Sequence, residues 1–416
     1  MSISQNFPEE GPTLNLNFAG SRTLDPRITF TRTSTGTYMG SDGLIKVAPA
    51  DSPRFDHRYV NGEIESLGLL VEEDRSNLFT YSTFYGDNGL SNVGINTNVS
   101  GISAPDGTFT AAEMYGSDST NNVKYMYKSY LTNTLGTYTT SVFMKYKNER
   151  YTVLRMNDNT GVNGCLQRID IQNGIFTNPV ETGGTLTGAA STITAYPNGW
   201  YRVSLTGTFV DALTQVQGSQ VYITTFGATT STNGIYLWGA QLEQGSFATS
   251  HIPRPDASTA TRNPDNVSMT GDNFSDWYNQ SEGTLYVRAN TDAGSGLRGV
   301  AALNLLSNFG DNRFDIRYDQ SGSSRGQFNP TSLTRTSGFN FTNPKFILSY
   351  ATDYRAFGIN ADITQSTSSF TPSTNVNTLI IGNFDAGTNY YLCGTISQLT
   401  YYPTRLTNAQ LQNLTK

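Results

Sequence analysis

Short segments in which apolar and polar residues alternate run through most of the chain. In residues 313–319 the even positions are apolar and the odd positions are charged. A period of two places successive side chains on opposite faces of a strand, so we expect Asp315 and Asp319 to face solvent. Residues 201–209 and 284–289 follow the same period. The pattern predicts an all-β protein.

Turn signals separate these segments. Asp-Gly at 42–43 and Asn-Gly at 173–174 favour tight β-hairpins. Residues 141–156 are expected to form another hairpin, with the polar sequence Lys-Asn-Glu-Arg at its tip. Residues 234–245 are apolar on both faces, which is typical of a central strand covered on each side. Short strands with a turn about every ten residues predict antiparallel β-sandwiches.

Changes in composition divide the chain into four segments. We expect an extended N-terminal arm, a first antiparallel sandwich, a Pro-rich linker and a second antiparallel sandwich, at residues 1–80, 81–255, 256–269 and 270–416. Prolines interrupt the arm, and it has too few apolar residues for a core of its own. It must therefore pack on the following domain or on another subunit. Near the end, Thr407 and Gln410 have the spacing of a capping box, which predicts a short helix.

The charge balance narrows the classes of partner. Charged residues make up 14 % of the 416 residues, and the formal net charge is −6. Binding to a phosphate backbone needs clustered lysine and arginine, which are scattered here, so we expect no nucleic acid as a partner. The start of the sequence has no basic segment followed by an apolar run, and no apolar stretch is long enough for a membrane span. We therefore expect neither an export signal nor membrane insertion.

Cysteine and histidine are rare. Cys165 and Cys393 lie far apart, and we expect two free buried thiols, with one disulfide as the alternative. His57 and His251 have no recognised zinc-site spacing relative to these cysteines. Zinc and redox chemistry are therefore not predicted.

Catalytic signatures are sparse. A glycan-cleaving enzyme needs two carboxylates facing each other across a cleft, yet no glutamate follows Glu282. No Gly-x-Ser-x-Gly motif is present, and two histidines give a Ser-His-Asp hydrolase little support. A cluster of acidic residues in the arm is expected to be hydrated or to contact another subunit: Glu63, Glu65, Glu72 and Glu73. We predict no catalytic residue and no enzymatic activity.

Three loop residues are possible ligands of a calcium ion. Asp311, Asn312 and Asp385 carry oxygen ligands of the kind that calcium prefers at the rim of a sandwich. Such residues are also common in turns, and we favour the interpretation that they form turns here. The prediction is no metal and no cofactor.

Two aromatic pairs could either stack a sugar ring or fill a core. In YPNGWYRVSLTGTF (196–209), a period of two places Tyr201 with the core and Trp200 on the opposite face. We interpret Trp200 as a plug at the end of the sandwich. Trp277 and Tyr278 precede the first strand of the second sandwich, where we expect them to cap the domain junction. Sugar stacking stays the alternative for both pairs, and the ligand-binding residues are unknown.

Several of these stretches together resemble a family of virion proteins from tailed bacteriophages, common in cyanophages. The resemblance is carried by FPEEGPTLNLNFAGSRTLDPRITFTRTSTGTYMGSDGLIKVAPADSPRFDH, ESLGLLVEEDRSNL, YPNGWYRVSLTG and LWGAQLEQGSFATSHIP. Members resemble tail-fibre, head-fibre or other minor structural proteins. Residues 81–255 look like a jelly roll of the carbohydrate-binding-module type. Residues 270–416, ending CGTISQLTYYPTRLTNAQLQNL, resemble the laminin-G/concanavalin-A-like lectin sandwich.

The resemblance implies a non-enzymatic structural protein of the virion. A receptor- or glycan-binding fibre or spike on the tail or head is favoured, followed by a capsid decoration or cement protein and then by a glycan depolymerase. The arm would attach the protein to tail, baseplate or capsid proteins, and the free form would be a homotrimer. A host-surface glycan is the candidate ligand. Assembly in the host cytoplasm and release by lysis would account for the missing export signal.

Overall fold

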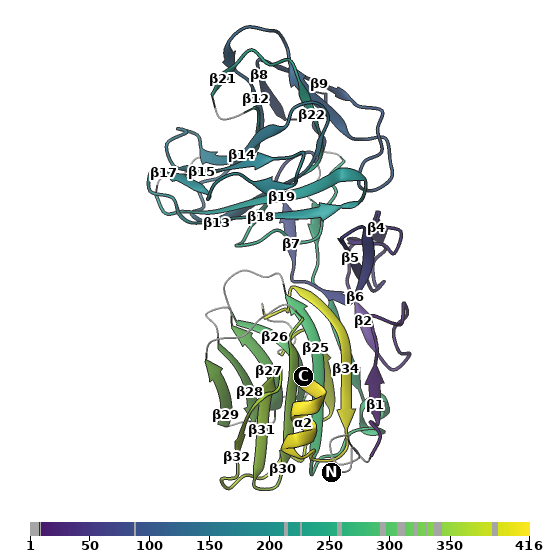
Figure 1. Cartoon of the computed structure of the whole chain (residues 1–416). Coiled ribbons are helices and arrows are strands. Elements are labelled where there is room, and N and C mark those ends of the chain that lie inside the picture. Colours follow the sequence, from purple (N-terminus) through teal and green to yellow (C-terminus); the bar gives the residue numbers. More distant parts are fainter. Residues whose placement is uncertain are drawn as a thin grey trace.

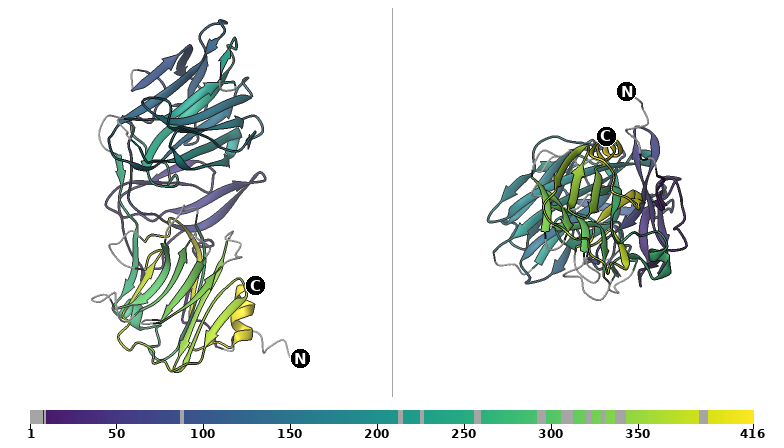
Figure 2. Two further views of the ribbon diagram at one scale, coloured as in Figure 1. Left: turned by 90° about the vertical axis from the view of Figure 1, so that its left-hand side faces the viewer. Right: turned by 90° about the horizontal axis from the view of Figure 1, so that it is seen from below.

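The computed structural model describes residues 8, 10–86, 89–211, 215–224, 227–255, 260–291, 297–305, 313–319, 323–328, 331–336, 343–384 and 390–416. These residues form β-sandwich domains built from antiparallel sheets, which confirms the predicted all-β class. Two β-rich bodies are stacked along one axis, with strands of the arm beside and between them (Figures 1 and 2). No described helix is long and apolar enough to cross a membrane.

The upper body in Figure 1 is the first sandwich, made of two layers. The β13 sheet has the order β18 (Thr187–Tyr196), β19 (Trp200–Phe209), β13 (Gly136–Tyr146), β22 (Gly234–Gln244), β10 (Ala112–Gly116) and β9 (Ile95–Val99). The β14 sheet has the order β16 (Ile175–Phe176), β15 (Gly164–Asp170), β14 (Tyr151–Asp158), β20 (Gln215–Ile223), β12 (Tyr125–Leu131) and β8 (Leu90–Val93), and β17 (Glu181–Gly183) also pairs with β15. An apolar core fills the space between the layers.

Local expectations for this body are partly confirmed. β22 is a central strand, and β15 and β16 form the hairpin around Gly174, whose φ of 66° suits glycine. The hairpin expected at 141–156 is wrong, because β13 and β14 belong to opposite sheets. The backbone N–H groups of Asn148 and Glu149 bond to the carbonyl of Gly234, so the polar tip arches from one layer to the other.

The lower body is the second sandwich, and both of its sheets contain strands of the arm. The β34 sheet has the order β32 (Asp362–Ser366), β31 (Tyr354–Ile359), β30 (Lys345–Ala351), β25 (Gly283–Thr291), β34 (Gly394–Tyr402), β6 (Glu63–Val71) and β5 (Phe55–Val60), and β1 (Leu14–Leu16) also pairs with β34. The β33 sheet has the order β2 (Thr29–Thr31), β24 (Asn266–Thr270), β33 (Thr378–Ile381), β26 (Leu297–Asn304), β27 (Arg313–Asp319), β28 (Ser323–Phe328) and β29 (Thr331–Thr336).

Residues 1–80 and 256–269 therefore differ from the expected arm and linker. Apolar residues of the arm complete the core of the second sandwich, which explains why the arm needs no core of its own: Leu14, Leu16, Phe18, Phe55, Leu69 and Val71. In the expected linker, residues 260–269 contain the strand β23 (Ala260–Arg262) and all but the last residue of β24. β23 pairs with β7 (Arg75–Asn77), with Asn77 opposite Ala260. The first sandwich is thus inserted between two neighbouring strands of one larger domain.

Smaller elements complete the structure. β3 (Gly36–Met39) and β4 (Ile45–Ala48) form the predicted hairpin, and β11 (Asn122–Val123) pairs with β21 (Ala228–Thr229). Helix α1 (Asp272–Ser275) precedes β25, and α2 (Asn408–Thr415) ends the chain. The capping box is confirmed, since the side chain of Thr407 accepts a bond from the N–H of Gln410, whose side chain bonds back.

Candidate functional site

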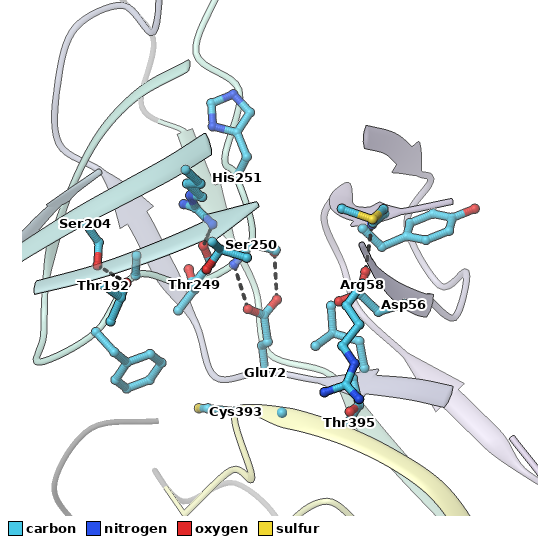
Figure 3. Close-up of a pocket in the computed structure, with 18 of the residues that line it drawn as sticks. Asp56, Arg58, Glu72, Thr192, Ser204, Thr249, Ser250, His251, Cys393 and Thr395 are labelled. Carbon is cyan, nitrogen blue, oxygen red and sulfur yellow. Dashed lines mark hydrogen bonds between the residues drawn. The ribbon is translucent and has the colours of Figure 1, made fainter. Parts of the chain in front are cut away.

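A cleft of about 550 Å³ lies where the first sandwich, the β3–β4 hairpin and the upper edge of the second sandwich meet (Figure 3). Small-molecule sites commonly have volumes of about 300–1,000 Å³ and occur between domains. Strands β18 and β19 form one wall and β5 forms the facing wall. Residues 246–251 also line the cleft, with Thr249 and Ser250 between the two walls, and residues 393–395 close the lower part (Figure 3).

Hydroxyl groups cover the wall from the first sandwich. The side chains of Thr192 and Ser204 share a hydrogen bond of 2.6 Å, and Thr194 and Thr206 lie on the same wall. They belong to the polar face of β18 and β19, because the opposite face carries the core residues. Arg202 on this wall donates to the carbonyl of Thr249 at 2.7 Å. The wall therefore offers several hydroxyls beside a guanidinium that is held in place.

Charged and titratable groups from β5 form the facing wall. Oδ1 of Asp56 accepts a bond of 2.7 Å from the N–H of Met39, and Nδ1 of His57 lies 2.9 Å from the Met39 carbonyl. Burial raises the pKa of Asp56 to about 7. Arg58 forms a partly exposed ion pair with Glu65 at 2.8 Å. Near neutral pH this wall can thus present a carboxyl group in either protonation state.

A buried ion network lies beneath the cleft. Arg54 bonds to Glu72 at 2.7 Å and to Asp265 at 2.5 Å, and Arg32 bonds to Asp265 at 2.9 Å. Arg262 is 3.1 Å from Glu72. Burial alone would raise the pKa of Glu72, but Arg262 and Arg54, with the hydrogen bonds from Ser250, lower it to about 2. The network joins the arm to the segment around β23 and β24.

A second set of charges extends this network toward the second sandwich. Arg298 bonds to Glu73 at 2.8 Å, and Arg75 also pairs with Glu73. Glu72 and Glu73 are therefore buried and paired with arginine, contrary to the expected hydrated acidic patch, whereas Glu63 and Glu65 are exposed as expected. Local sequence could not reveal this network, because its partners come from segments far apart in the chain.

The two thiols are free and buried, as predicted. Cys393 lies on the cleft, and burial raises the pKa of its thiol to about 12. Burial likewise raises the pKa of Cys165 to about 12. Neither thiol is therefore a ready nucleophile.

The first predicted aromatic pair is divided between two clusters. Trp200 is 1 % exposed and packs with Ile45 of the β3–β4 hairpin, and its Nε1 donates to the Ser103 carbonyl at 3.1 Å. It has no exposed ring face for a sugar and fills the contact between the β13 sheet and the hairpin, not the end of the sandwich. Tyr201 lies on the core side, as parity predicted, but is only partly buried.

The second pair lies elsewhere than expected. Trp277 is buried against Phe274 and Tyr401, and Tyr278 packs against the same core. Tyr401 is at the opposite end of β34 from Gly394, which lines the cleft, so the pair caps the far end of the sandwich instead of the domain junction.

Two further expectations concern charged residues. Asp315 is fully buried, with Arg317 at 2.5 Å and Arg313 at 2.6 Å, because Phe384 covers this face of β27 and lies 3.9 Å from the Arg317 guanidinium. The expectation that Asp315 faces solvent is therefore wrong, and the side chain of Asp319 lies outside the described residues. Also outside them are the three possible calcium ligands: Asp311, Asn312 and Asp385. Among the described residues, no group of three or more His, Cys, Asp or Glu side chains could hold a metal ion.

Comparison with known proteins finds similarity among solved structures. No protein-family model matches the sequence, and no curated protein matches it. The carbohydrate-binding module CBM40 of the Ruminococcus gnavus IT-sialidase, bound to α2,3-sialyllactose, is 14 % identical over 33 % of this chain and 84 % of its own length, with a TM-score of 0.30. The NanB sialidase of Streptococcus pneumoniae (K499G) is 14 % identical over 35 % of this chain and 26 % of its own length, with a TM-score of 0.30. The Trypanosoma rangeli sialidase is 10 % identical over 73 % of this chain and 60 % of its own length, with a TM-score of 0.29.

These similarities are confined to β-sandwich architecture. With identities of 10–14 % and TM-scores of 0.29–0.30, they carry no argument about the cleft or about activity. The resemblance to phage virion proteins stays a prediction.

Proposed function

We propose that this chain is a non-enzymatic structural protein of a phage virion, a fibre or spike that binds a host-surface glycan in the junction cleft. The observation that carries the binding role is the pair of facing walls: hydroxyls of β18 and β19 on one side, and Asp56 and Arg58 on the other. Sugar hydroxyls both donate and accept hydrogen bonds, so they suit a wall of hydroxyl, carboxyl and guanidinium groups. The virion role rests on the sequence resemblance alone.

The contacts of Glu72, a carboxyl group that lines the cleft, support a non-catalytic role. Oε1 of Glu72 accepts a bond of 2.8 Å from the N–H of Ser250, and Oε2 accepts bonds of 2.7 Å from both Arg54 and the Ser250 hydroxyl. Glu72 is also buried. A carboxylate so occupied is poorly placed to attack a sugar, whereas a depolymerase needs two carboxyl groups that reach its substrate.

Binding of the full-length protein to a printed array of bacterial surface glycans tests the proposal. Arg58→Ala and Thr194→Val should each weaken binding without lowering the melting temperature, because both side chains line the cleft and reach solvent. Arg27→Ala is the matched control, since Arg27 forms a similarly exposed ion pair with Asp25 away from the cleft. Unchanged binding by both cleft variants would overturn the cleft assignment, and shortening of an array glycan would overturn the non-enzymatic role.

The virion role has a separate test. Antibody labelling of intact particles in the electron microscope should place the protein on the tail or head of the virion. Uniform labelling of the capsid with no glycan binding would favour a decoration protein instead.

A further inference from the structure

The outer face of the β14 sheet carries a row of aromatic rings away from the junction cleft. Tyr127 and Tyr125 on β12 have ring centroids 6.1 Å apart with an interplanar angle of 22°. Tyr125 and Tyr222, on the neighbouring strand β20, have centroids 4.8 Å apart with an angle of 17°. In Figure 1, β14 and β15 lie above β18 and β19, on the side away from the second sandwich.

Strand register explains why the three rings form a row. Tyr125 lies opposite Tyr222 in the β12–β20 ladder, and Tyr127 is two residues further along β12, so all three belong to one face. The inward positions of these strands are core residues such as Met126 and Val221. Mutual stacking restricts the rings to one arrangement, so little side-chain entropy remains to be lost when a ligand binds.

A hydrogen-bonded series of polar groups runs beside the rings across β20 and β14. The Tyr222 hydroxyl donates to Oε1 of Gln220 at 2.9 Å, and Nε2 of Gln220 donates to Oε1 of Gln217 at 3.2 Å. Nδ2 of Asn157 donates to the same Gln217 oxygen at 3.2 Å. Arg155 donates to Oε1 of Gln220 at 3.3 Å. These contacts fix the amides in a defined orientation along the sheet face.

One member of the series is an unsatisfied acceptor. Asn157 is 1 % exposed, and its Oδ1 has no hydrogen-bond partner. Leaving a buried polar atom unpaired costs about 1–3 kcal/mol. A ligand hydroxyl that reached it past the partly exposed side chain of Gln217 would satisfy it.

We infer that this tyrosine–amide face is a second binding site, which takes a neutral glycan chain. Aromatic rings contact the C–H face of a pyranose, and amide side chains exchange hydrogen bonds with its hydroxyls. Tyr125, Tyr127 and Gln217 are partly exposed and would make these contacts. Tyr222 and Gln220 are buried and hold them in place from below.

A neutral chain fits because the one cation of the series, the Arg155 guanidinium, already donates to Gln220, Tyr222 and the Gly161 carbonyl. The amides need no carboxylate or phosphate as a partner. This site is independent of the junction cleft, since none of its residues lines that cleft.

Affinity electrophoresis of the full-length protein in gels containing dextran, mannan or xyloglucan tests the inference, with polygalacturonate as the charged comparison. At least one neutral polysaccharide should retard the protein more than polygalacturonate does. Tyr127→Ala should weaken that retardation at least about tenfold, because a partly exposed ring supplies contact area to the ligand. Gln217→Ala should weaken it as well.

Two controls keep the test decisive. Tyr151→Ala removes a 40 %-exposed tyrosine at the end of β14, outside the row, and should leave retardation unchanged. Arg27→Ala, outside both sites, should also leave it unchanged. Because Tyr127→Ala leaves every cleft residue in place, its loss of retardation tests this site separately from the cleft proposal. Absence of retardation in all three neutral gels, or equal retardation of Tyr127→Ala and the native protein with an unchanged melting temperature, would overturn the inference.

Discussion

At the scale of single residues, Trp200 and Tyr201 show how neighbouring aromatic side chains serve different contacts. The Trp200 indole is enclosed by Ile45, Phe143 and other members of a small cluster, whereas Tyr201 is only partly covered. Trp200→Ala should therefore lower the free energy of unfolding by about 3–5 kcal/mol. Tyr201→Ala should cost less, about 1–2 kcal/mol, because less of its surface is removed from water. Urea unfolding of both variants measures the difference, and a larger loss for Tyr201→Ala would contradict this assignment.

Asp56 gives a pH-dependent prediction at the same scale. Its pKa of about 7 in the folded protein lies above the ordinary aspartate value, so the folded state keeps a proton that the unfolded state releases. Stability contributed by this group is present at low pH and is lost as the pH rises from about 4 to about 7. Asp56→Asn keeps an acceptor for the Met39 N–H and should melt at a higher temperature than the native protein at about pH 8, with little difference at about pH 4.

Asp42 in the neighbouring hairpin is the matched control. Its side-chain hydrogen bond with Lys46 lowers its pKa, so its contribution to stability has the opposite sign and is lost as the pH falls. Asp42→Asn should therefore melt no higher than the native protein at about pH 8. A native melting temperature that does not fall between about pH 4 and pH 7 relative to Asp56→Asn would show that Asp56 titrates normally.

At the scale of elements, the buried ion network connects strands that are distant in sequence. Asp265 accepts hydrogen bonds from Arg32, Arg54 and the N–H of Glu72, and both arginine side chains are fully buried. Asp265→Asn leaves these guanidiniums short of a counter-charge, which should cost about 3–5 kcal/mol. Hydrogen exchange should accelerate in β2, β5 and β6. Asp25→Asn, which breaks the exposed pair with Arg27, should cost no more than about 1 kcal/mol, and equal losses in the two variants would contradict the network's role.

The sequence predicts individual strands better than it predicts which elements pack against them. The period of two identified Phe314, Ile316 and Tyr318 as core residues, because side-chain parity depends only on the strand itself. Parity could not show that Phe384 covers the opposite face and buries Asp315, since this contact joins residues about seventy positions apart. The arch between β13 and β14 looks like a hairpin in the sequence. An arch between two sheets and a hairpin within one sheet are both flanked by strands of alternating apolar and polar residues. The cleft and the tyrosine–amide face likewise depend on strand order, which local patterns do not contain.

At the scale of the whole molecule, the homotrimer expected from the resemblance stays a prediction. The arm pairs with the second sandwich of its own chain, so the apolar residues that it contributes to the core are covered without another subunit. A trimer would therefore need a different contact surface. Sedimentation of the full-length protein measures the oligomeric state, and a monomer at micromolar concentration would contradict the trimer.

The inserted position of the first sandwich leads to a paired prediction about deletion. Removing residues 1–66 takes away β1–β5 and the first four residues of β6. It unpairs β34 from β1 and removes Leu14, Leu16, Phe18 and Phe55 from the core, so the product should aggregate or lose its cooperative transition. Replacing residues 79–258 by a short glycine-rich loop removes far more of the chain, yet should leave a soluble domain with one cooperative transition, because Asn77 and Ala260 are already neighbours in an antiparallel pair. Circular dichroism and calorimetry distinguish the two outcomes. A soluble, cooperative product of the first deletion together with an unfolded product of the second would show that the arm is dispensable and that the domain is not organised around the β7–β23 pair.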